Sequence, residues 1–328
     1  MNQFDYDIDD FLECCQCQNL RRKTLKSYEQ TLRIFTRYMT DVMKVTDAKD
    51  TKELHIREYI KYLQSRGKYT VVGKDDNKTT NNPDSRSDFG QVISNTTINN
   101  YMRNIKVFYN YLYNNRLINN NPVSRVKSLK NEREPLEFIT DLQFKRLIET
   151  FDLSKFHEYR DYIIFQLILD TGMRIGEALC IDVKNVDLQR KMIFLPAEDT
   201  KGNKSRYVFF SLEMFKLLKR WIAFKDRYLD SEFLFSTNRR GKLAVNNFEK
   251  NFRVYAKRSG LNDIHPHVLR NNFAKRLLMQ GVIYTLSRIL GHSSVTVTEK
   301  AYLDLDDEDL RQNYIQYSPL EHIKKNRI

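Results

Sequence analysis

The stretch Thr171-Gly172-Met173-Arg174-Ile175-Gly176-Glu177 closes an apolar helix and starts another helix at an arginine. Arg174 and Glu177 stand three residues apart, a spacing that suits an ion pair on one helix face. Three further short stretches carry basic or titratable residues: Lys201 to Lys204, His267 to Arg270, and Leu290 to His292, which Tyr302 follows. All four stretches lie in the second half of the chain, so the chemistry is expected there.

The chain has 328 residues, which is long for one hydrophobic core and suits two domains. Hydrophobic residues make up 41% and aromatic residues 12%, enough to bury cores, so a globular protein is expected. The 55 Lys and Arg residues exceed the 42 Asp and Glu residues, which gives a net charge of +13. Excess positive charge favours polyphosphate partners such as nucleic acids, although many basic proteins bind none.

Nothing in the sequence marks the chain for export or for a membrane. Residues 1–7 are acidic where a signal peptide would be basic, and no apolar core follows. The longest apolar stretch, 162–169, is interrupted by Gln166 and is far too short to span a bilayer. The cysteines do not form the two spaced pairs of a zinc site, because three crowd one short segment and the fourth stands alone: Cys14, Cys15, Cys17 and Cys180. We therefore expect a cytoplasmic protein with reduced thiols, no metal and no membrane contact.

Apolar residues recur every three to four positions in three segments of the first half. This period predicts amphipathic helices that start at about Thr24 and that cover 53–64 and 97–113. Asn119-Asn120-Asn121-Pro122 ends the helical region. Residues 1–124 are therefore expected to form a small helical domain with basic, Asn-rich outer faces.

Two polar segments have no such period. Residues 68–94 are rich in Asp, Asn, Lys and Ser, which is typical of a solvated insertion, with a hairpin expected at Tyr69 to Val72. A DNA-contacting finger is the alternative for this segment. Residues 125–136 are charged and are expected to be an extended linker, either solvated or lying along a duplex.

The second domain is expected over residues 137–305. Its predicted helices are 141–151, the apolar helix that ends at Thr171-Gly172, 212–228, 246–259 and 270–280. Two short strands are predicted at 191–195 and 206–210. The predicted fold class is thus mainly α with a small antiparallel sheet.

The four stretches supply what metal-free attack on a phosphodiester requires. Two guanidiniums, Arg174 and Arg270, would grip the non-bridging oxygens with bidentate, permanently charged hydrogen bonds. Loss of one such preorganised contact lowers a rate by on the order of 100- to 1000-fold. Lys201, in a turn between the two strands, would protonate the leaving oxygen. His267 and His292 would donate to phosphate oxygens and assist proton transfer.

Tyr302 is the predicted nucleophile. Attack by its phenolate gives a covalent phosphotyrosine that stores the bond energy, so rejoining needs no ATP. Residues 293–301 would carry it on a short helix or mobile segment behind the preceding histidine. Each candidate alone also fits a plain structural role: a surface ion pair, an ordinary basic turn, a helix cap, or packing by one of 19 tyrosines. Their joint occurrence in this order favours the catalytic interpretation.

This set of motifs resembles that of the tyrosine recombinases, also called phage-type integrases, over about residues 137–305. The family pattern is Thr-Gly-Xaa-Arg-Xaa-Xaa-Glu, a Lys-Gly-Xaa-Lys hairpin, His-Xaa-Leu-Arg, and Leu-Gly-His-Ser-Ser with a later tyrosine, and each part is present. The N-terminal half is similar to the family's core-binding domain. Asn271 departs from the pattern, since a second histidine is common there. Ten positions separate His292 from Tyr302, where many members have nine.

The resemblance implies a SAM-like helical core-binding domain followed by a tyrosine-recombinase catalytic domain. It implies site-specific cleavage and rejoining of double-stranded DNA through a 3′-phosphotyrosine intermediate, without a cofactor. The implied catalytic residues are Arg174, Lys201, His267, Arg270, His292 and Tyr302. The implied assembly is a homo-tetramer on paired DNA sites, with accessory DNA-bending proteins as further partners. The tail, residues 306–328, would dock on a neighbouring subunit, or its acidic start would simply be solvated.

The biological role stays open between integration or excision of a mobile element and Xer-like resolution, and the insertion at 68–94 favours a mobile element. Two other functions compete with recombination. One is a DNA-binding accessory factor without catalysis, and the other is a type IB topoisomerase, which would act as a monomer on one duplex. The target DNA sequence cannot be read from one chain, because contacts to the DNA backbone carry no sequence information.

Overall fold

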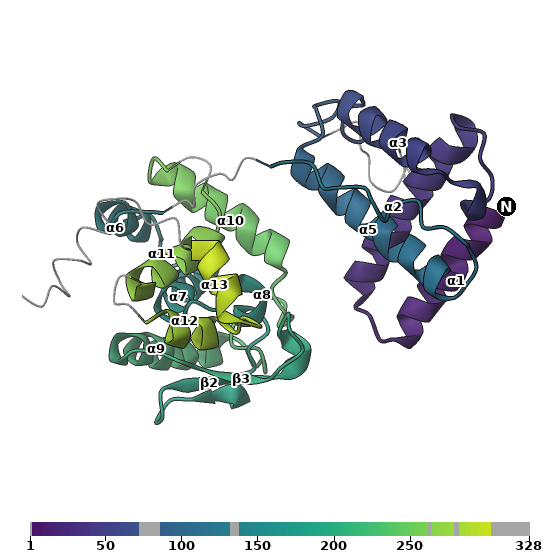
Figure 1. Cartoon of the computed structure of the whole chain (residues 1–328). Coiled ribbons are helices and arrows are strands. Elements are labelled where there is room, and N and C mark those ends of the chain that lie inside the picture. Colours follow the sequence, from purple (N-terminus) through teal and green to yellow (C-terminus); the bar gives the residue numbers. More distant parts are fainter. Residues whose placement is uncertain (1, 72–85, 132–137, 262–263, 279–281, 303–328) are drawn as a thin grey trace, which may run out of the picture. The chain divides into compact units, whose positions relative to one another are not determined.

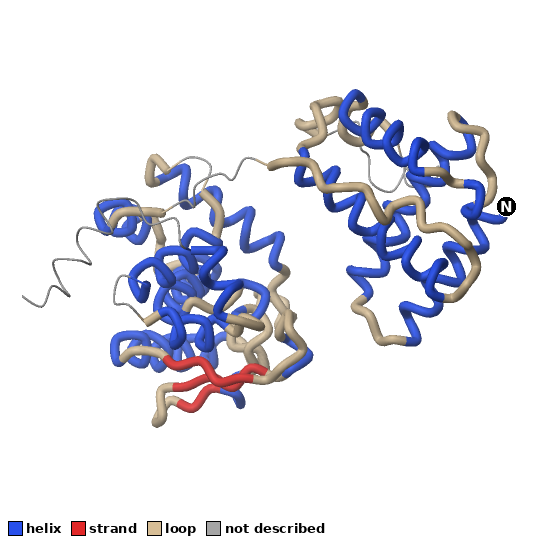
Figure 2. The backbone as a smooth tube through the Cα atoms, viewed as in Figure 1, coloured by secondary structure: helices blue, strands red, loops and turns tan. Residues whose placement is uncertain are grey.

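The computed structural model describes residues 2–71, 86–131, 138–261, 264–278 and 282–302 (Figure 1). The chain divides into two compact units, Met1–Arg133 and Glu134–Ile328, and each is described by itself. Figure 2 shows that helices dominate both units and that the strands lie together in the second. The predicted fold class, mainly α with a small antiparallel sheet, is confirmed.

The first unit packs its helices around an aromatic core. The helices are α1 (Gln3–Cys17), α2 (Arg22–Asp41), α3 (Glu53–Ser65) and α5 (Asn95–Asn114). Phe35 of α2, Tyr59 of α3 and Tyr109 of α5 are fully buried, and the Phe35 ring meets both other rings edge-on. Because burial of one such ring contributes roughly 2–3 kcal/mol, this cluster joins the three helices.

Helix α1 lies ahead of the first predicted helix, which was expected from about Thr24. Its buried side chains recur at steps of four and three residues: Phe4, Ile8, Phe11 and Cys15. The helical period was therefore present in the sequence. Asn2 fixes the start of α1, because its side chain accepts a hydrogen bond from the Asp5 backbone N–H at 3.1 Å.

The segment expected to be an insertion, 68–94, begins and ends at a narrow neck. Gly67 and Val92 form an isolated antiparallel bridge. A Cβ on Gly67 would lie 2.6 Å from the Gly90 carbonyl oxygen, so this approach of the two backbones requires glycine. The hairpin predicted at Tyr69 to Val72 is wrong over its described part, because 69–71 form a turn without strand pairing. Residues 72–85, on which the alternative of a DNA-contacting finger depends, lie outside the described residues.

The first half of the segment expected to be a linker packs on α5. Val126 is buried, and its carbonyl oxygen accepts a hydrogen bond from Lys106 Nζ. The Asn99 side chain accepts from the Leu129 N–H at 2.8 Å and donates to the Leu129 carbonyl at 3.0 Å. Residues 132–136 of the expected linker lie outside the described part of the chain.

The second unit is built around helix α7 (Phe156–Thr171), which buries residues on several sides. The helices α9 (Leu212–Tyr228), α10 (Val245–Arg258) and α11 (His267–Leu278) contact it, and α6 (Asp141–Glu149) stacks Phe144 on Phe165 of α7. Trp221 of α9 is fully buried, and its Nε1–H donates to the Leu234 carbonyl at 2.9 Å. The helices predicted over these segments are confirmed, with ends shifted by a few residues.

The sheet has the strand order β1 (Val186–Asp187), β2 (Met192–Leu195) and β3 (Arg206–Phe209), with both pairs antiparallel. Ile193, Leu195 and Val208 are buried on its inner face. Side chains alternate along a strand, so Arg206 also belongs to the inner face, opposite Leu195. Strands β2 and β3 were predicted, whereas β1 is too short to produce a period.

Three short helices complete the second unit: α8 (Ile175–Ala178), α12 (Ile283–Leu290) and α13 (Val295–Tyr302). Helices α12 and α13 contact each other and α11. Within the described ranges, every helix is too short or too polar to cross a bilayer. The tail expected to dock on a neighbouring subunit, 306–328, falls outside those ranges.

Candidate active site

Arg174 is held at the start of α8 by Glu177. The Arg174 backbone N–H donates to Glu177 Oε2 at 2.9 Å, and Arg174 Nη1 donates to Oε1 at 3.1 Å. The sequence left open a surface ion pair here, but the Glu177 side chain is only 2% exposed. Burial raises the pKa of the Glu177 carboxyl, and hydrogen bonds and charge from Arg206 and Arg174 more than offset this, so its pKa is lowered. Glu177 is therefore a buried carboxylate at neutral pH.

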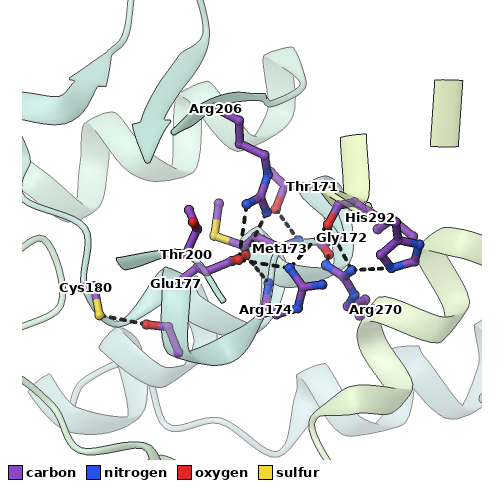
Figure 3. A network of polar contacts seen from close by, with 12 residues as sticks. Thr171, Gly172, Met173, Arg174, Glu177, Cys180, Thr200, Arg206, Arg270 and His292 are labelled. Carbon is purple, nitrogen blue, oxygen red and sulfur yellow. Dashed lines mark hydrogen bonds and ion pairs between the residues drawn. The ribbon is translucent and has the colours of Figure 1, made fainter. Parts of the chain in front are cut away.

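The glycine turn before Arg174 brings the second arginine to the same place. Gly172 ends α7 in the left-handed region at φ +66°, and its carbonyl oxygen accepts a hydrogen bond from Arg270 Nη1 at 2.5 Å. Arg270 Nη2 donates to the Leu290 carbonyl at 3.1 Å, and Arg174 Nη1 approaches the same oxygen at 3.4 Å. Two guanidiniums, one from the residue before α8 and one from α11, thus meet at the last residue of α12. Figure 3 shows Arg174 and Arg270 next to each other.

His292 links this arginine pair to α13. Its Nε2 lies 3.1 Å from Arg270 Nη2, and its Nδ1 lies 2.7 Å from Thr298 Oγ1. Desolvation and the positive charges of Arg270, Arg174 and Arg206 lower the pKa of His292 to about 4, so the ring is neutral at pH 7. Because Arg270 can only donate, Nε2 accepts, and Nδ1 must carry the proton that it donates to Thr298.

His267 lies beside the same pair. It is the first residue of α11, about one helical turn before Arg270. Partial desolvation lowers the pKa of His267, and the nearby charges of Arg270 and Arg174 lower it further. His267 is therefore neutral at pH 7 and can accept a proton.

Lys201 lies in the connection between β2 and β3, as predicted, and is exposed. The Thr200 hydroxyl shapes this turn, because its Oγ1 accepts from the Lys204 N–H at 3.1 Å. Among the described contacts, none joins Lys201 to Arg174, Arg270 or the histidines. The strand that follows the turn does reach them, through Arg206.

Tyr302 is the last residue of α13. Its backbone lies four residues, about one helical turn, beyond Thr298, whose hydroxyl contacts His292. Its side chain is outside the described part of the structure. The structure thus brings Arg174, Arg270 and His292 into contact, sets His267 beside them, and puts the turn of Lys201 next to a strand that contacts the site.

Arg206 and Thr298 are site residues that the sequence did not single out. Arg206 Nη2 donates to Glu177 Oε2 at 2.7 Å and Nη1 donates to Oε1 at 3.1 Å. A charged residue two positions before the buried Val208 was the available signal, since both face the core side of one strand. Thr298 carried no signal, because its role depends on how α13 packs.

The described residues hold no cluster of His, Cys, Asp or Glu side chains that could bind a metal ion. The cysteines are free: Cys14, Cys15, Cys17 and Cys180. Arg174 and Arg270 offer cationic hydrogen-bond donors beside neutral histidines, which suits a phosphate group.

Comparison with known protein families matches residues 137–309 to the Phage integrase family. The tyrosine recombinase XerC of Pediococcus pentosaceus is 25% identical over 306 residues, which cover 90% of this chain and 92% of that protein. The tyrosine recombinase XerC of Thermodesulfovibrio yellowstonii is 30% identical over 236 residues, which cover 69% of this chain and 77% of that protein.

Solved structures share the fold at lower identity. The Tn1549 transposon integrase in complex with a circular intermediate DNA aligns with a TM-score of 0.71 at 17% identity, over 97% of this chain and 100% of that chain. The XerH site-specific recombinase bound to a palindromic difH substrate aligns with a TM-score of 0.67 at 18% identity, over 92% of this chain and 82% of that chain.

Proposed function

Because this chain belongs to the phage integrase family of tyrosine recombinases, we propose that it is a site-specific recombinase that cleaves and rejoins double-stranded DNA. The strand is cut by transfer of the phosphate to a tyrosine, which gives a 3′-phosphotyrosine intermediate. No metal ion or ATP takes part in this proposed reaction.

The meeting of Arg174 and Arg270 at the Leu290 carbonyl carries the proposal. A carbonyl oxygen with two guanidiniums around it marks a position where a partial negative charge is already favoured. A phosphate oxygen carries more negative charge, and arginine forks match phosphate geometry. The two arginines would therefore neutralise the scissile phosphate and stabilise the extra charge of the transition state.

Tyr302 is the nucleophile in this proposal. Its phenolic oxygen attacks phosphorus, the bond to the DNA 5′-oxygen breaks, and that oxygen leaves with a proton from Lys201. His267 is neutral at pH 7 and so can take the phenolic proton. His292 has both ring nitrogens engaged in the structure, which favours a role in holding Arg270 in place.

The proposed substrate is double-stranded DNA, and the proposed assembly is a tetramer. A net charge of +13 suits a DNA partner. Strand exchange needs four active sites, so we propose a homo-tetramer on two paired DNA sites, with accessory DNA-bending proteins where a site requires them. The relatives named XerC support an Xer-like resolution role, and the similarity to a transposon integrase keeps integration or excision of a mobile element as the alternative. Because DNA is the substrate, the cytoplasmic location expected from the sequence is part of the proposal.

The test is covalent capture on DNA. Duplexes selected from a randomised pool by binding to the full chain are nicked next to the cleavage position, so that cleavage releases a short fragment and traps the adduct. Wild type should form a protein–DNA adduct, and Tyr302→Phe should bind the same duplexes and form none. Tyr284→Phe is the matched control, since Tyr284 is a tyrosine on α12 that is 70% exposed.

The outcomes separate the competing functions. An adduct that survives in Tyr302→Phe would identify another nucleophile. Binding without any adduct in wild type would favour a DNA-binding accessory factor. Relaxation of a supercoiled plasmid by the monomer, without paired sites, would favour a topoisomerase.

A further inference from the structure

Arg206 shares one buried carboxylate with a proposed catalytic arginine. Glu177 Oε1 accepts from Arg206 Nη1 and from Arg174 Nη1, both at 3.1 Å. Glu177 Oε2 accepts from Arg206 Nη2 at 2.7 Å and from the Arg174 N–H at 2.9 Å. Figure 3 shows Glu177 between the two guanidiniums, with Arg270 and His292 beyond Arg174.

The Arg206 guanidinium also packs against the turn that precedes His292. Gly291 has φ +64°, and a Cβ built on it would lie 3.0 Å from Arg206 Cζ and 3.1 Å from Nε. The guanidinium plane therefore lies close to the backbone of this turn. Arg206 Nε is buried and has no hydrogen-bond partner among the described residues. The orientation of the guanidinium is therefore set by its two bonds to Glu177 and by its packing on the Gly291 backbone.

These contacts place Arg206 between three parts of the site. It begins β3, five residues after Lys201. Through Glu177 it reaches the start of α8, where Arg174 lies, and through Gly291 it reaches the turn of His292. A change at Arg206 therefore acts on all three parts at once, although its own side chain is only 13% exposed.

The presence of two arginines on one carboxylate, Glu177, sets the net charge of this part of the site. One carboxylate with two guanidiniums leaves a net charge of +1. Without Arg206, Glu177 would be matched by Arg174 alone, and the positive charge that a phosphate meets there would be cancelled. Interactions of this kind are strong in a half-buried site because the local dielectric is low.

We infer that Arg206 is a positioning residue of the cleavage reaction, which keeps Arg174 available to the scissile phosphate by sharing Glu177 and fastens the Lys201 turn to the site. This inference rests on the proposed DNA-cleaving function. Arg206 is a strand residue outside the predicted catalytic set, and its role is to position members of that set.

The first test is a mutant cycle on single-turnover adduct formation, with saturating duplex DNA. Arg206→Gln should slow adduct formation by roughly 10- to 100-fold, with duplex affinity unchanged within about twofold. Arg206→Lys, which keeps the charge but not the fork, should lie between Arg206→Gln and wild type. In Arg206→Gln/Glu177→Gln the carboxylate that cancels Arg174 is gone, so the double variant should react faster than Arg206→Gln alone. Arg190→Gln, on an arginine that is 76% exposed in the same unit, should react like wild type.

The second test does not depend on cleavage. The charged groups that lower the pKa of His292 are Arg270, Arg174 and Arg206, so Arg206→Gln should raise this pKa in an NMR titration of the histidine ring. A loss of structural support alone would not produce this shift in a variant that unfolds at the wild-type temperature. If Arg206→Gln does not fold, Arg206→Lys carries the rate test.

The results distinguish the inference from the function beneath it. If wild type forms no adduct, the proposed function fails, while the titration still tests the electrostatic part. If wild type forms the adduct and Arg206→Gln forms it equally fast, or if the double variant is slower than Arg206→Gln, the inference about Arg206 is overturned. An unchanged His292 pKa in folded Arg206→Gln overturns its electrostatic part.

Discussion

Replacement of Gly172 by alanine should destabilise the second unit strongly. Gly172 has φ +66°, where a residue with a Cβ costs about 1–2 kcal/mol. The added Cβ would also lie 2.3 Å from Cδ1 of the Phe273 ring. Overpacking of this kind costs about 1–3 kcal/mol, so the two effects sum to roughly 2–5 kcal/mol. That is a large part of the 5–15 kcal/mol that typically stabilises a domain.

The assay is guanidinium unfolding followed by the fluorescence of Trp221. This residue is the only tryptophan of the chain and is fully buried in the second unit, so its emission reports that unit alone. Gly176→Ala is the matched control, because a Cβ there meets nothing within 4 Å and Gly176 lies inside α8. Alanine in a helix is favoured over glycine by up to about 1 kcal/mol, so this variant should be at least as stable as wild type.

A second substitution separates the two effects. Phe273→Ala removes the ring that the new Cβ would meet, so Gly172→Ala should cost only about 1–2 kcal/mol in that background. Equal stability of Gly172→Ala and wild type would refute the reasoning about the turn. An equal cost of Gly172→Ala with and without the Phe273 ring would refute the steric part.

Three other outcomes are expected. The pKa of His292 is lowered to about 4 from 6.5, so between these pH values the unfolded chain binds a proton that the folded chain does not. The free energy of unfolding of the second unit should therefore fall by up to about 3 kcal/mol as pH drops from 6.5 to 4, and His292→Gln should remove much of this slope. A free energy of unfolding that does not change over this pH range would contradict the prediction. Thr298→Val deletes the hydroxyl that the His292 Nδ1–H contacts, so adduct formation should slow by roughly tenfold while DNA affinity stays unchanged. Thr296→Val, on the same helix, should not slow adduct formation. Affinity for duplex DNA, measured by fluorescence anisotropy, should fall steeply between about 50 and 200 mM salt because phosphate contacts release counterions, and an affinity that stays constant would count against phosphate recognition.

The helices of the second unit could be predicted because their apolar residues repeat with the helical period. The helix predicted at 212–228 has the bounds observed for α9. Helix α1 was not predicted, although Phe4, Ile8 and Phe11 follow the helical period. The predicted hairpin at Tyr69 failed for another reason: β-branched residues raise strand propensity, but the pairing is decided by the close approach of Gly67 and Gly90.

The site divides along similar lines. Short motifs pointed to Arg174, Arg270 and His292. Permanently charged residues and histidines are common singly, but their occurrence together in one order along the chain indicates a shared site. Arg206 and Thr298 could not be found in this way, since one depends on the register of β2 and β3 and the other on the packing of α13. The partner that Arg270 meets at the end of α7 is a backbone carbonyl, and the sequence does not specify backbone contacts between distant segments.

The convergence of two guanidiniums on the Leu290 carbonyl has a consequence for how this unit is built. Like charges repel at such short range, and the Leu290 carbonyl, the Gly172 carbonyl and the Glu177 carboxylate compensate part of that repulsion. The repulsion that remains lowers the stability of the folded state. The free energy that offsets this repulsion must come from the apolar core around α7 and Trp221. Removing the Arg174 charge leaves Glu177 paired with Arg206, so it should raise the stability of this unit while abolishing the proposed cleavage of DNA, as is usual where a functional site is kept at a cost in stability.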